Sequence, residues 1–321
     1  MKKALKVLVL LAAVSVFCIP AGAKEFLVCG TSANTGTYYL YGGNWSKVMN
    51  SKVPDVDITC EVSGGPTKNL QLIGNGDIDL GFTTGWMAGE AYAGMGVFEG
   101  KPTTKAKAMF PMYSSVMYLY ALADSPINSL YDLKGKHVIT GSPGGTSDKA
   151  ARALLKALGI EPSQISSLTG NTGANAIKDG MADAGFYVGS VPASFLMNIE
   201  TTHKIKFIKI TDEEFAKIFE AFPFWTKDVM PANTYKNQPD EYSFISFWNY
   251  SIAREDLSEK LVYDMVKATF ENNETFIATD KNFRTTTTEN VSKIVTELHP
   301  GAYKYYKEIG VVVPENIIPK K

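Results

Sequence analysis

Two loops rich in glycine, serine and threonine constrain the fold most, because each lies between a predicted strand and a predicted helix. The first loop, residues 30–37, follows the β-prone residues 26–29 and leads into a helical segment. The second loop, residues 141–147, follows a strand-like run and precedes a predicted helix over residues 148–158. Small residues let a ligand approach the backbone, and the first N–H groups of a helix have no partner within it. Both loops therefore predict anion cradles, and together they suggest a ligand gripped from two sides.

The N-terminal residues have the pattern of an export signal. Three lysines precede an apolar run over residues 7–19, and the small residues 21–23 precede a cleavage point. We expect residues 1–23 to be a cleaved signal peptide, so that the mature chain begins at Lys24. The apolar run is shorter than the roughly 20 residues that span a membrane. Bulky residues directly before Cys18 argue against a lipid anchor. An unanchored binding protein is retained only by an outer membrane, so we expect a periplasmic location.

The mature chain is long enough for two domains, and its composition is globular. Removal of 23 residues from 321 leaves 298, whereas an ordinary domain has about 150. The chain is 45% hydrophobic and 20% charged, which is typical of a globular protein rather than a disordered one. Its 32 basic and 33 acidic residues give a net charge of −1, and the loss of three lysines leaves 29 against 33, or −4. Without a basic surplus, nucleic acid is excluded as a partner.

Cysteine and histidine are sparse in the mature chain, and their spacing predicts no metal site. Cys29 and Cys60 end two strands that we expect to be neighbours, so an oxidising compartment permits a disulfide between them. Two buried thiols are the equal alternative. His137, His203 and His299 are scattered along the chain, and structural roles are expected for all three. We therefore expect neither a metal nor a cofactor.

Strand-like and helix-like segments alternate in the first part of the chain. After the first strand come predicted strands over residues 56–62 and 77–82 and predicted helices over residues 38–50, 67–73 and 86–92. Such alternation predicts parallel strands joined by crossover helices. In sheets of this kind the loops at the carboxyl ends of the strands line the ligand crevice. The loops at residues 31–37, 63–65 and 83–85 are thus expected on one edge.

The second part of the chain repeats this alternation and then returns to the first domain. Strands are predicted over residues 137–140, 182–188 and 204–210, and helices over residues 148–158, 259–272 and 289–298. The apolar runs at residues 106–123 and 244–252 are expected to cross between the domains. The run at residues 285–288 is predicted as a loop and helix cap. Beyond the signal peptide, we expect lobe 1 to comprise residues 24–115 and 245–321, and lobe 2 to comprise residues 116–244.

The order of several short motifs carries a family resemblance. These motifs are Gly30-Thr31 through Thr35-Gly36-Thr37-Tyr38-Tyr39, Ser63-Gly64-Gly65 with Asn69-Leu70, Asp79-Leu80-Gly81-Phe82, Asp132-Leu133-Lys134-Gly135-Lys136, Gly141-Ser142-Pro143-Gly144 and Leu298-His299-Pro300-Gly301-Ala302-Tyr303. Together they resemble the solute-binding proteins of TRAP transporters, TAXI family (TRAP-associated extracytoplasmic immunogenic). The resemblance implies an α/β chain with the two-lobed periplasmic-binding-protein (type II) fold, a hinge and a central ligand cleft. It also implies capture of a small carboxylate, glutamate-like or dicarboxylate, and its delivery to TRAP permease membrane subunits.

Neutral groups dominate the loops of the expected cleft. The three arginines, Arg152, Arg254 and Arg284, lie outside these loops, which argues against an arginine clamp on a carboxylate. Backbone N–H groups, hydroxyls and helix N-termini are therefore the expected anion ligands. The predicted ligand-binding residues are Thr31, Thr35, Gly36, Thr37, Tyr38, Ser63, Gly64, Thr84, Gly145, Thr146, Ser147 and Tyr187. For the hydroxyls, the alternative to ligand binding is helix capping. For the tyrosines the alternative is core packing, and the same alternative holds for Trp86 as a lid over the aliphatic part of a ligand.

An enzyme is the main alternative class, because a glycine-rich loop can also cradle phosphate. The second loop lacks the Gly-Lys-Ser/Thr ending of a nucleotide P-loop, since Lys149 follows Asp148. The sequence shows no serine-centred elbow and no histidine–carboxylate pair, so no catalytic residue is predicted. A soluble sensor is a third class, which a neighbouring permease gene would distinguish from a transporter receptor. We expect a monomer.

Overall fold

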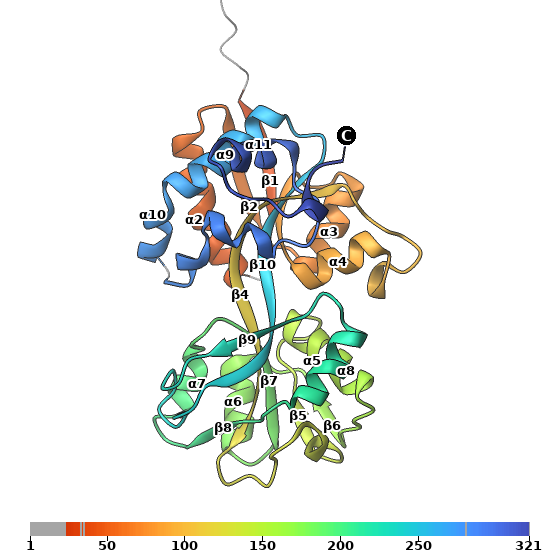
Figure 1. Ribbon diagram of the computed structural model, residues 1–321. Helices are drawn as coiled ribbons and strands as arrows, with labels where there is room; N and C mark the ends of the chain where they lie inside the picture. Colours follow the sequence, from red (N-terminus) through yellow and green to blue (C-terminus); the bar gives the residue numbers. More distant parts are fainter. Residues whose placement is uncertain (1–23, 33, 35, 280, 321) are drawn as a thin grey trace, which may run out of the picture.

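Two α/β lobes form the protein (Figure 1), and two long strands run through both. The computed structural model describes residues 24–32, 34, 36–279 and 281–320; the predicted signal peptide and Thr35 lie outside these residues. The two long strands, β4 (Ala106–Leu122) and β10 (Tyr242–Arg254), pair with each other in antiparallel fashion. They sit in the middle of one continuous sheet with the order β2-β1-β3-β10-β4-β7-β5-β6. The two lobes are therefore linked through the backbone of this sheet.

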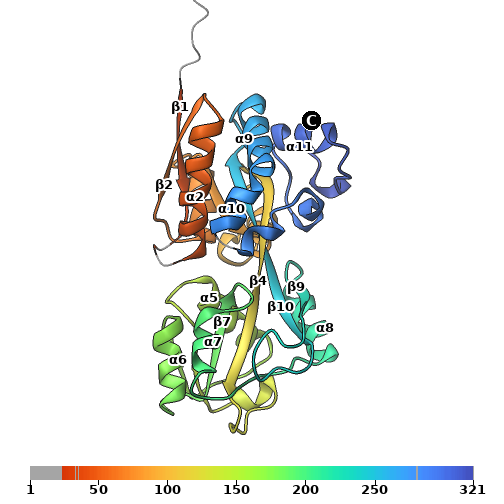
Figure 2. The same ribbon diagram turned by 90° about the vertical axis from the view of Figure 1, so that its left-hand side faces the viewer.

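Lobe 1, the upper part of Figure 1, contains both ends of the described chain. Its other strands and its helices are β1 (Glu25–Gly30), β2 (Val56–Glu61), β3 (Leu80–Thr84), α2 (Thr37–Lys52), α3 (Pro66–Asn75), α4 (Gly85–Ala93), α9 (Glu259–Glu271), α10 (Asn273–Thr279) and α11 (Pro300–Glu308). β1 pairs in parallel with both β2 and β3. Parallel pairing places the carboxyl ends of the three strands at one edge, and this edge faces lobe 2 (Figures 1 and 2).

Lobe 2 has a smaller parallel unit built in the same way. Its elements are β5 (His137–Ile139), β6 (Gln164–Ser166), β7 (Ala184–Gly189), β8 (Ile205–Phe207), β9 (Thr226–Met230), α5 (Thr146–Ala157), α6 (Gly170–Lys178), α7 (Ser194–Ile199) and α8 (Asp212–Ala221). β5 pairs in parallel with β6 and β7. The start of α5 lies at the end of lobe 2 nearest lobe 1 (Figure 1). Among the described residues, no helix is both long and apolar enough to cross a membrane.

The crossing strands are buried along most of their length, which explains their apolar and aromatic sequence. Pro111 has no N–H to donate, and the ladder between β4 and β10 is irregular where Pro111 faces Tyr250. Beside this irregularity the buried Asn249 side chain bonds across the pair. Its Nδ2 donates to the backbone oxygen of Tyr113 at 2.8 Å and to Oγ of Ser115 at 2.9 Å. Specific polar contacts thus fix the register where the chain passes between the lobes.

The predicted elements lack β6, β9, α6, α7 and α8, and they also lack several short 3₁₀ segments. The 3₁₀ segments are η1 (Gly96–Phe98), η2 (Leu130–Leu133), η3 (Lys281–Thr285), η4 (Thr288–Lys293) and η5 (Glu315–Ile317). The predicted helix over residues 289–298 is wrong: η4 occupies its start, and the α-helix, α11, begins later, at Pro300. His299 caps that helix by accepting a hydrogen bond from the N–H of Gly301, and proline suits the first helical position. The third strand begins later than predicted, at Leu80, so Thr83 and Thr84 end a strand rather than form a loop.

Cys29 and Cys60 pair directly across β1 and β2, as their positions in the sequence suggested. Both are free thiols in this structure. Cys29 is fully buried, whereas Cys60 is half-buried. Burial raises the pKa of the Cys29 thiol, and the hydrogen bond from Cys29 lowers the pKa of Cys60.

Candidate functional site

Asn69 of α3 holds together the strand ends at the edge of lobe 1. Its Nδ2 donates to the backbone oxygens of Thr31 at 2.9 Å and Phe82 at 2.8 Å. The Oγ of Ser63 lies 2.6 Å from Oδ1 of Asn69 and 2.9 Å from the same Thr31 oxygen. A Cβ at Gly30 would lie 2.6 Å from Oδ1 of Asn69, so only glycine permits this close approach. The edge is therefore a preformed surface, and the Ser63 hydroxyl takes part in holding it.

Thr31 and Thr84, two of the predicted ligand contacts, use their hydroxyls on the backbone of lobe 1. Oγ1 of Thr31 donates to the backbone oxygen of Glu61 at 2.6 Å. Oγ1 of Thr84 accepts from the N–H of Met87 at 3.1 Å and so caps α4. Both side chains are buried. Thr84 thus has the capping role that the sequence left as the alternative, whereas the Thr31 hydroxyl binds the end of β2.

The start of α2 contains three further predicted contacts. Gly36 occupies the N-cap position without a side-chain bond, and Thr37 is half-buried at the first helical position. The ring of Tyr38 is buried, and its hydroxyl donates to Oδ1 of Asn249 at 2.6 Å. This bond joins the start of α2 to the crossing strand β10.

The first residues of α5 bring the second glycine-rich loop to the edge of lobe 2. Gly145 is the N-cap residue, and Thr146 and Ser147 are half-buried in the first turn. Oγ of Ser147 accepts a hydrogen bond from the N–H of Val188 at 2.8 Å, which ties the helix to β7. Within the part of the chain that the structure describes, the Thr146 hydroxyl makes no hydrogen bond. The Thr146 hydroxyl is thus available to a ligand, whereas the Ser147 hydroxyl is already bonded to β7.

Asp148 is turned into lobe 2. Its carboxylate accepts hydrogen bonds from Oγ1 of Thr140 at 2.5 Å, the N–H of Gly144 at 3.1 Å and Nε of Arg152 at 2.8 Å. Burial raises the pKa of Asp148, but these hydrogen bonds together lower it below the ordinary value. The negative charge therefore stabilises the loop before α5 from inside lobe 2.

Tyr187, the last of the predicted contacts, belongs to an aromatic cluster in lobe 2. Its ring lies 4.6 Å from that of Phe195 and 6.1 Å from that of Tyr118, measured between centroids. A Cβ at Gly189 would lie 2.4 Å from the Tyr187 ring, so the ring also fills the space above that glycine. Tyr187 is not among the residues that line the pocket between the lobes.

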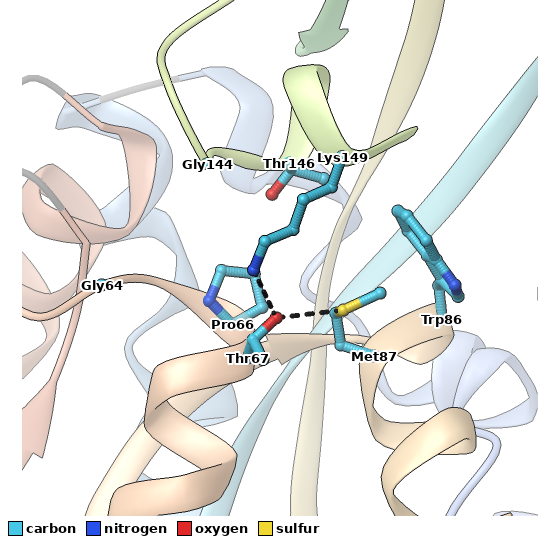
Figure 3. A pocket seen from close by; sticks show the side chains of 8 residues that line it. All are labelled: Gly64, Pro66, Thr67, Trp86, Met87, Gly144, Thr146 and Lys149. Carbon is cyan, nitrogen blue, oxygen red and sulfur yellow. Dashed lines mark hydrogen bonds between the residues drawn. The ribbon is translucent and has the colours of Figure 1, made fainter. Parts of the chain in front are cut away.

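A small pocket lies where α3 and α4 of lobe 1 meet α5 of lobe 2 (Figure 3). Its volume is about 10 Å³, which is near the minimum for one water molecule. The lining residues are Gly64, Pro66, Thr67, Trp86, Met87, Gly144, Thr146 and Lys149. Pro66 and Thr146 are the first residues of their helices, so the N-terminal ends of α3 and α5 both open on this pocket.

Lys149 reaches across the pocket from lobe 2 to lobe 1 (Figure 3). Its Nζ donates to Oγ1 of Thr67 at 3.1 Å, and the Thr67 hydroxyl donates in turn to Sδ of Met87 at 3.1 Å. Burial lowers the pKa of Lys149, and the charges of Asp148 and Glu90 oppose this effect. A half-buried ammonium group therefore faces a neutral acceptor between the lobes.

Glu90 of α4 lies one helical turn beyond Trp86, which lines the pocket. Its Oε1 accepts a hydrogen bond from Nε1 of Trp86 at 2.5 Å. Burial raises the pKa of Glu90, while the bond from Trp86 and the charge of Lys149 lower it. A carboxylate and an ammonium group thus interact electrostatically from opposite lobes.

Aromatic side chains between α8 and β9 also bridge the two lobes. The ring of Trp225 meets the ring of Trp86 edge-on, with centroids 5.1 Å apart. Phe247 of β10 stacks on Trp86 at 5.5 Å. A Cβ at Gly89 would lie 2.4 Å from the Phe224 ring, so glycine lets this segment pack against α4. The indole of Trp86 is therefore packed between Phe247 of the crossing strand β10 and Trp225 of lobe 2.

The chain belongs to the NMT1-like family. The match covers residues 29–310 of the 321 residues. The match does not distinguish branches within the family, so the TAXI branch that the motifs predict stays a prediction.

Solved structures share the fold of this NMT1-like chain at low sequence identity. XAC2383 from Xanthomonas citri bound to ATP has a TM-score of 0.53 and 11% identity, covering 89% of this chain and 96% of that chain. A TctC solute binding protein from Polaromonas has a TM-score of 0.51 and 15% identity, covering 83% and 87%. The expected α/β fold of periplasmic binding proteins is confirmed.

The pocket of this NMT1-like chain unites two of the predicted residues with others that the sequence did not single out. Gly64 and Thr146 line it, and the other lining residues include Thr67, Met87 and Lys149. Thr67 and Lys149 lie in the first turns of helices that follow glycine-rich loops, and this position is the signal that the sequence contains for them. Among the described residues, no group of three or more His, Cys, Asp or Glu side chains is placed to hold a metal.

Proposed function

We propose that this chain is the extracytoplasmic solute receptor of a tripartite TRAP transporter. It captures a small carboxylate, glutamate-like or dicarboxylate, and delivers it to membrane permease subunits. The observation that carries the proposal is the interlobe pocket, since residues of α3, α4 and α5 from both lobes line one cavity. A ligand enclosed there contacts both lobes at once. Membership of the NMT1-like family and the fold shared with a TctC solute binding protein support a receptor.

The groups around the pocket favour an anion. α3 has 10 residues and α5 has 12, and both present their N-terminal ends to the cavity. Each such end contributes about 0.3–1 kcal/mol toward a bound negative charge. Lys149 adds a formal positive charge, and the Thr146 hydroxyl adds a donor. Trp86 and Met87 supply apolar surface for the aliphatic part of a short acid.

Binding requires the lobes to separate. A cavity of about 10 Å³ has room for about one water molecule and none for an organic acid. β4 and β10 pass between the lobes near residues 114–116 and 244–247, and bending there opens the cleft. The acid then enters between the helix ends, and closure brings the second lobe onto it.

Partners and location follow from the same proposal. Residues 1–23 direct the chain to the periplasm, and the mature monomer, with lobe 1 at residues 24–115 and 245–321 and lobe 2 at residues 116–244, meets a permease. A ligand-binding sensor without a transporter is the second candidate, because a sensor binds solute with the same pocket. A permease gene beside the gene for this chain separates the two.

The test starts from the ligand retained through purification. Native mass spectrometry of the mature protein should show one bound acid, and calorimetry with glutamate, glutarate, malate and 2-oxoglutarate should show 1:1 binding of at least one. The bound acid should be recovered chemically intact after incubation. If none of these acids binds and a nucleotide such as ATP does, the carboxylate proposal fails. Conversion of the bound acid would establish an enzyme.

A further inference from the structure

We propose that Lys149 and Glu90 together make the interlobe pocket select acids with one net negative charge and reject dianions. The inference rests on the proposed function, because it names the charge class of the acid that the same pocket takes. It assigns two roles: Lys149 pairs with the carboxylate of the ligand, and Glu90 repels a second negative charge.

The first observation is the isolation of Lys149 in the pocket. Of the described residues that line the cavity, Lys149 alone carries a formal charge. Its Nζ donates to Oγ1 of Thr67, a neutral acceptor, at 3.1 Å. A ligand carboxylate that takes the place of this hydroxyl makes a charge-assisted hydrogen bond, which is roughly twice as strong as a neutral one. One ammonium group balances one carboxylate, so a second carboxylate finds no cation among the described residues that line the cavity.

The second observation is the fixed position of Glu90. Its Oε1 accepts a hydrogen bond from Trp86, whose indole lines the pocket, at 2.5 Å. A Cβ at Gly96 would lie 2.5 Å from Oε2 of Glu90, so the carboxylate occupies the space above this glycine. Trp86 itself is held by Trp225 and Phe247. The bond from the indole therefore holds the Glu90 carboxylate beside the pocket.

The third observation concerns the other acidic side chain near the start of α5. Asp148 is turned into lobe 2, where Arg152, Thr140 and the N–H of Gly144 neutralise or bind its oxygens. Of the two remaining charges, Lys149 lines the pocket and Glu90 bonds to Trp86, which lines it, and these two charges interact across the cleft. Their sum is zero, so the site favours a ligand of low net charge. At a partly buried site, repulsion between Glu90 and a second carboxylate of the ligand weakens the binding affinity several-fold.

The test compares two acids of one shape and different charge. Glutarate is a dianion at pH 7, and its monoamide, glutaramate, has the same chain length and one negative charge. We expect calorimetry on the native protein to show tighter binding of glutaramate. Glu90→Gln should strengthen glutarate binding by about fivefold or more without strengthening glutaramate binding. Glu99→Gln is the matched control, because Glu99 is exposed in the same lobe and its loss removes the same charge.

A second pair of variants tests the role of Lys149. Lys149→Met should weaken both acids by about tenfold or more, since a hydrogen bond between charged groups is lost. Lys156→Met is the control, because Lys156 is exposed on the same helix. An unchanged affinity of Lys149→Met for both acids would overturn the pairing role.

The outcomes separate this inference from the proposed function. Tighter binding of glutarate than of glutaramate by the native protein overturns the charge selection, and this measurement needs no variant. An unchanged ratio in Glu90→Gln overturns the role of Glu90, provided its thermal unfolding matches that of Glu99→Gln. Binding of neither acid, while other carboxylates bind, also overturns the inference. If no carboxylate binds at all, the proposed function itself fails.

Discussion

Two neighbouring hydroxyls at the start of α5 should respond differently to removal. Thr146 lines the pocket, and its hydroxyl makes no hydrogen bond within the described residues. The Ser147 hydroxyl instead accepts from the N–H of Val188 at 2.8 Å. We therefore expect Thr146→Ala to weaken ligand binding and leave stability unchanged. Ser147→Ala should lower stability and leave the affinity of the folded protein nearly unchanged.

The structure sets the size of both effects. A hydrogen bond from the Thr146 hydroxyl to a carboxylate contributes roughly 1.5–3 kcal/mol, which corresponds to an affinity loss of about 10- to 150-fold. In Ser147→Ala the partly buried N–H of Val188 loses its acceptor. An unpaired buried donor costs about 1–3 kcal/mol of unfolding free energy. Thr146→Ala should thus have the larger effect in the binding assay, and Ser147→Ala should have the larger effect in the stability assay.

The assays are calorimetry with the acid identified above and urea denaturation of the ligand-free protein. Ser163→Ala serves as the control, because Ser163 is exposed in lobe 2 and its change should alter neither quantity by more than about 0.5 kcal/mol. Native affinity in Thr146→Ala together with reduced stability would refute the reasoning. That pattern would mean that Thr146 supports the helix and that the ligand binds elsewhere.

Three further predictions concern closure, thiol reactivity and pH. Small-angle scattering should give a smaller radius of gyration with saturating ligand than without, and equal radii would contradict the proposed closure. Iodoacetamide should modify Cys60 before Cys29 in the folded protein, since Cys29 is fully buried with a raised pKa; peptide mass spectrometry with equal labelling of both would oppose this. Burial lowers the pKa of His299 to about 4, so unfolding free energy should fall by up to about 3 kcal/mol as the pH drops from about 6.5 toward 4. His299→Asn keeps an acceptor for the N–H of Gly301, and a pH dependence as steep as that of the native protein would argue against His299 as the cause.

The local signals in the sequence were sufficient for the parallel unit of lobe 1, whereas β6 and α6 of lobe 2 were not predicted. Gly65 and Pro66 mark the start of α3, and the apolar periodicity of residues 148–158 marks most of α5. The helix after residue 288 was mispredicted because its charged and polar residues also suit a 3₁₀ segment. α11 lies outside the predicted helices, although His299-Pro300-Gly301 supplies a cap and a proline at the first helical position.

The pocket itself depends on contacts between residues far apart in the chain. Lys149 meets Thr67, 82 positions earlier, only because β4 and β10 bring the end of lobe 2 under the edge of lobe 1. In the sequence, Lys149 follows an aspartate that could cancel its charge. The fold turns Asp148 inward onto Arg152, so Asp148 makes no ion pair with Lys149, and the ammonium group is directed toward the other lobe. Whether a lysine beside an aspartate serves as an anion ligand is thus decided by tertiary packing, and spacing along the chain carries no signal for it.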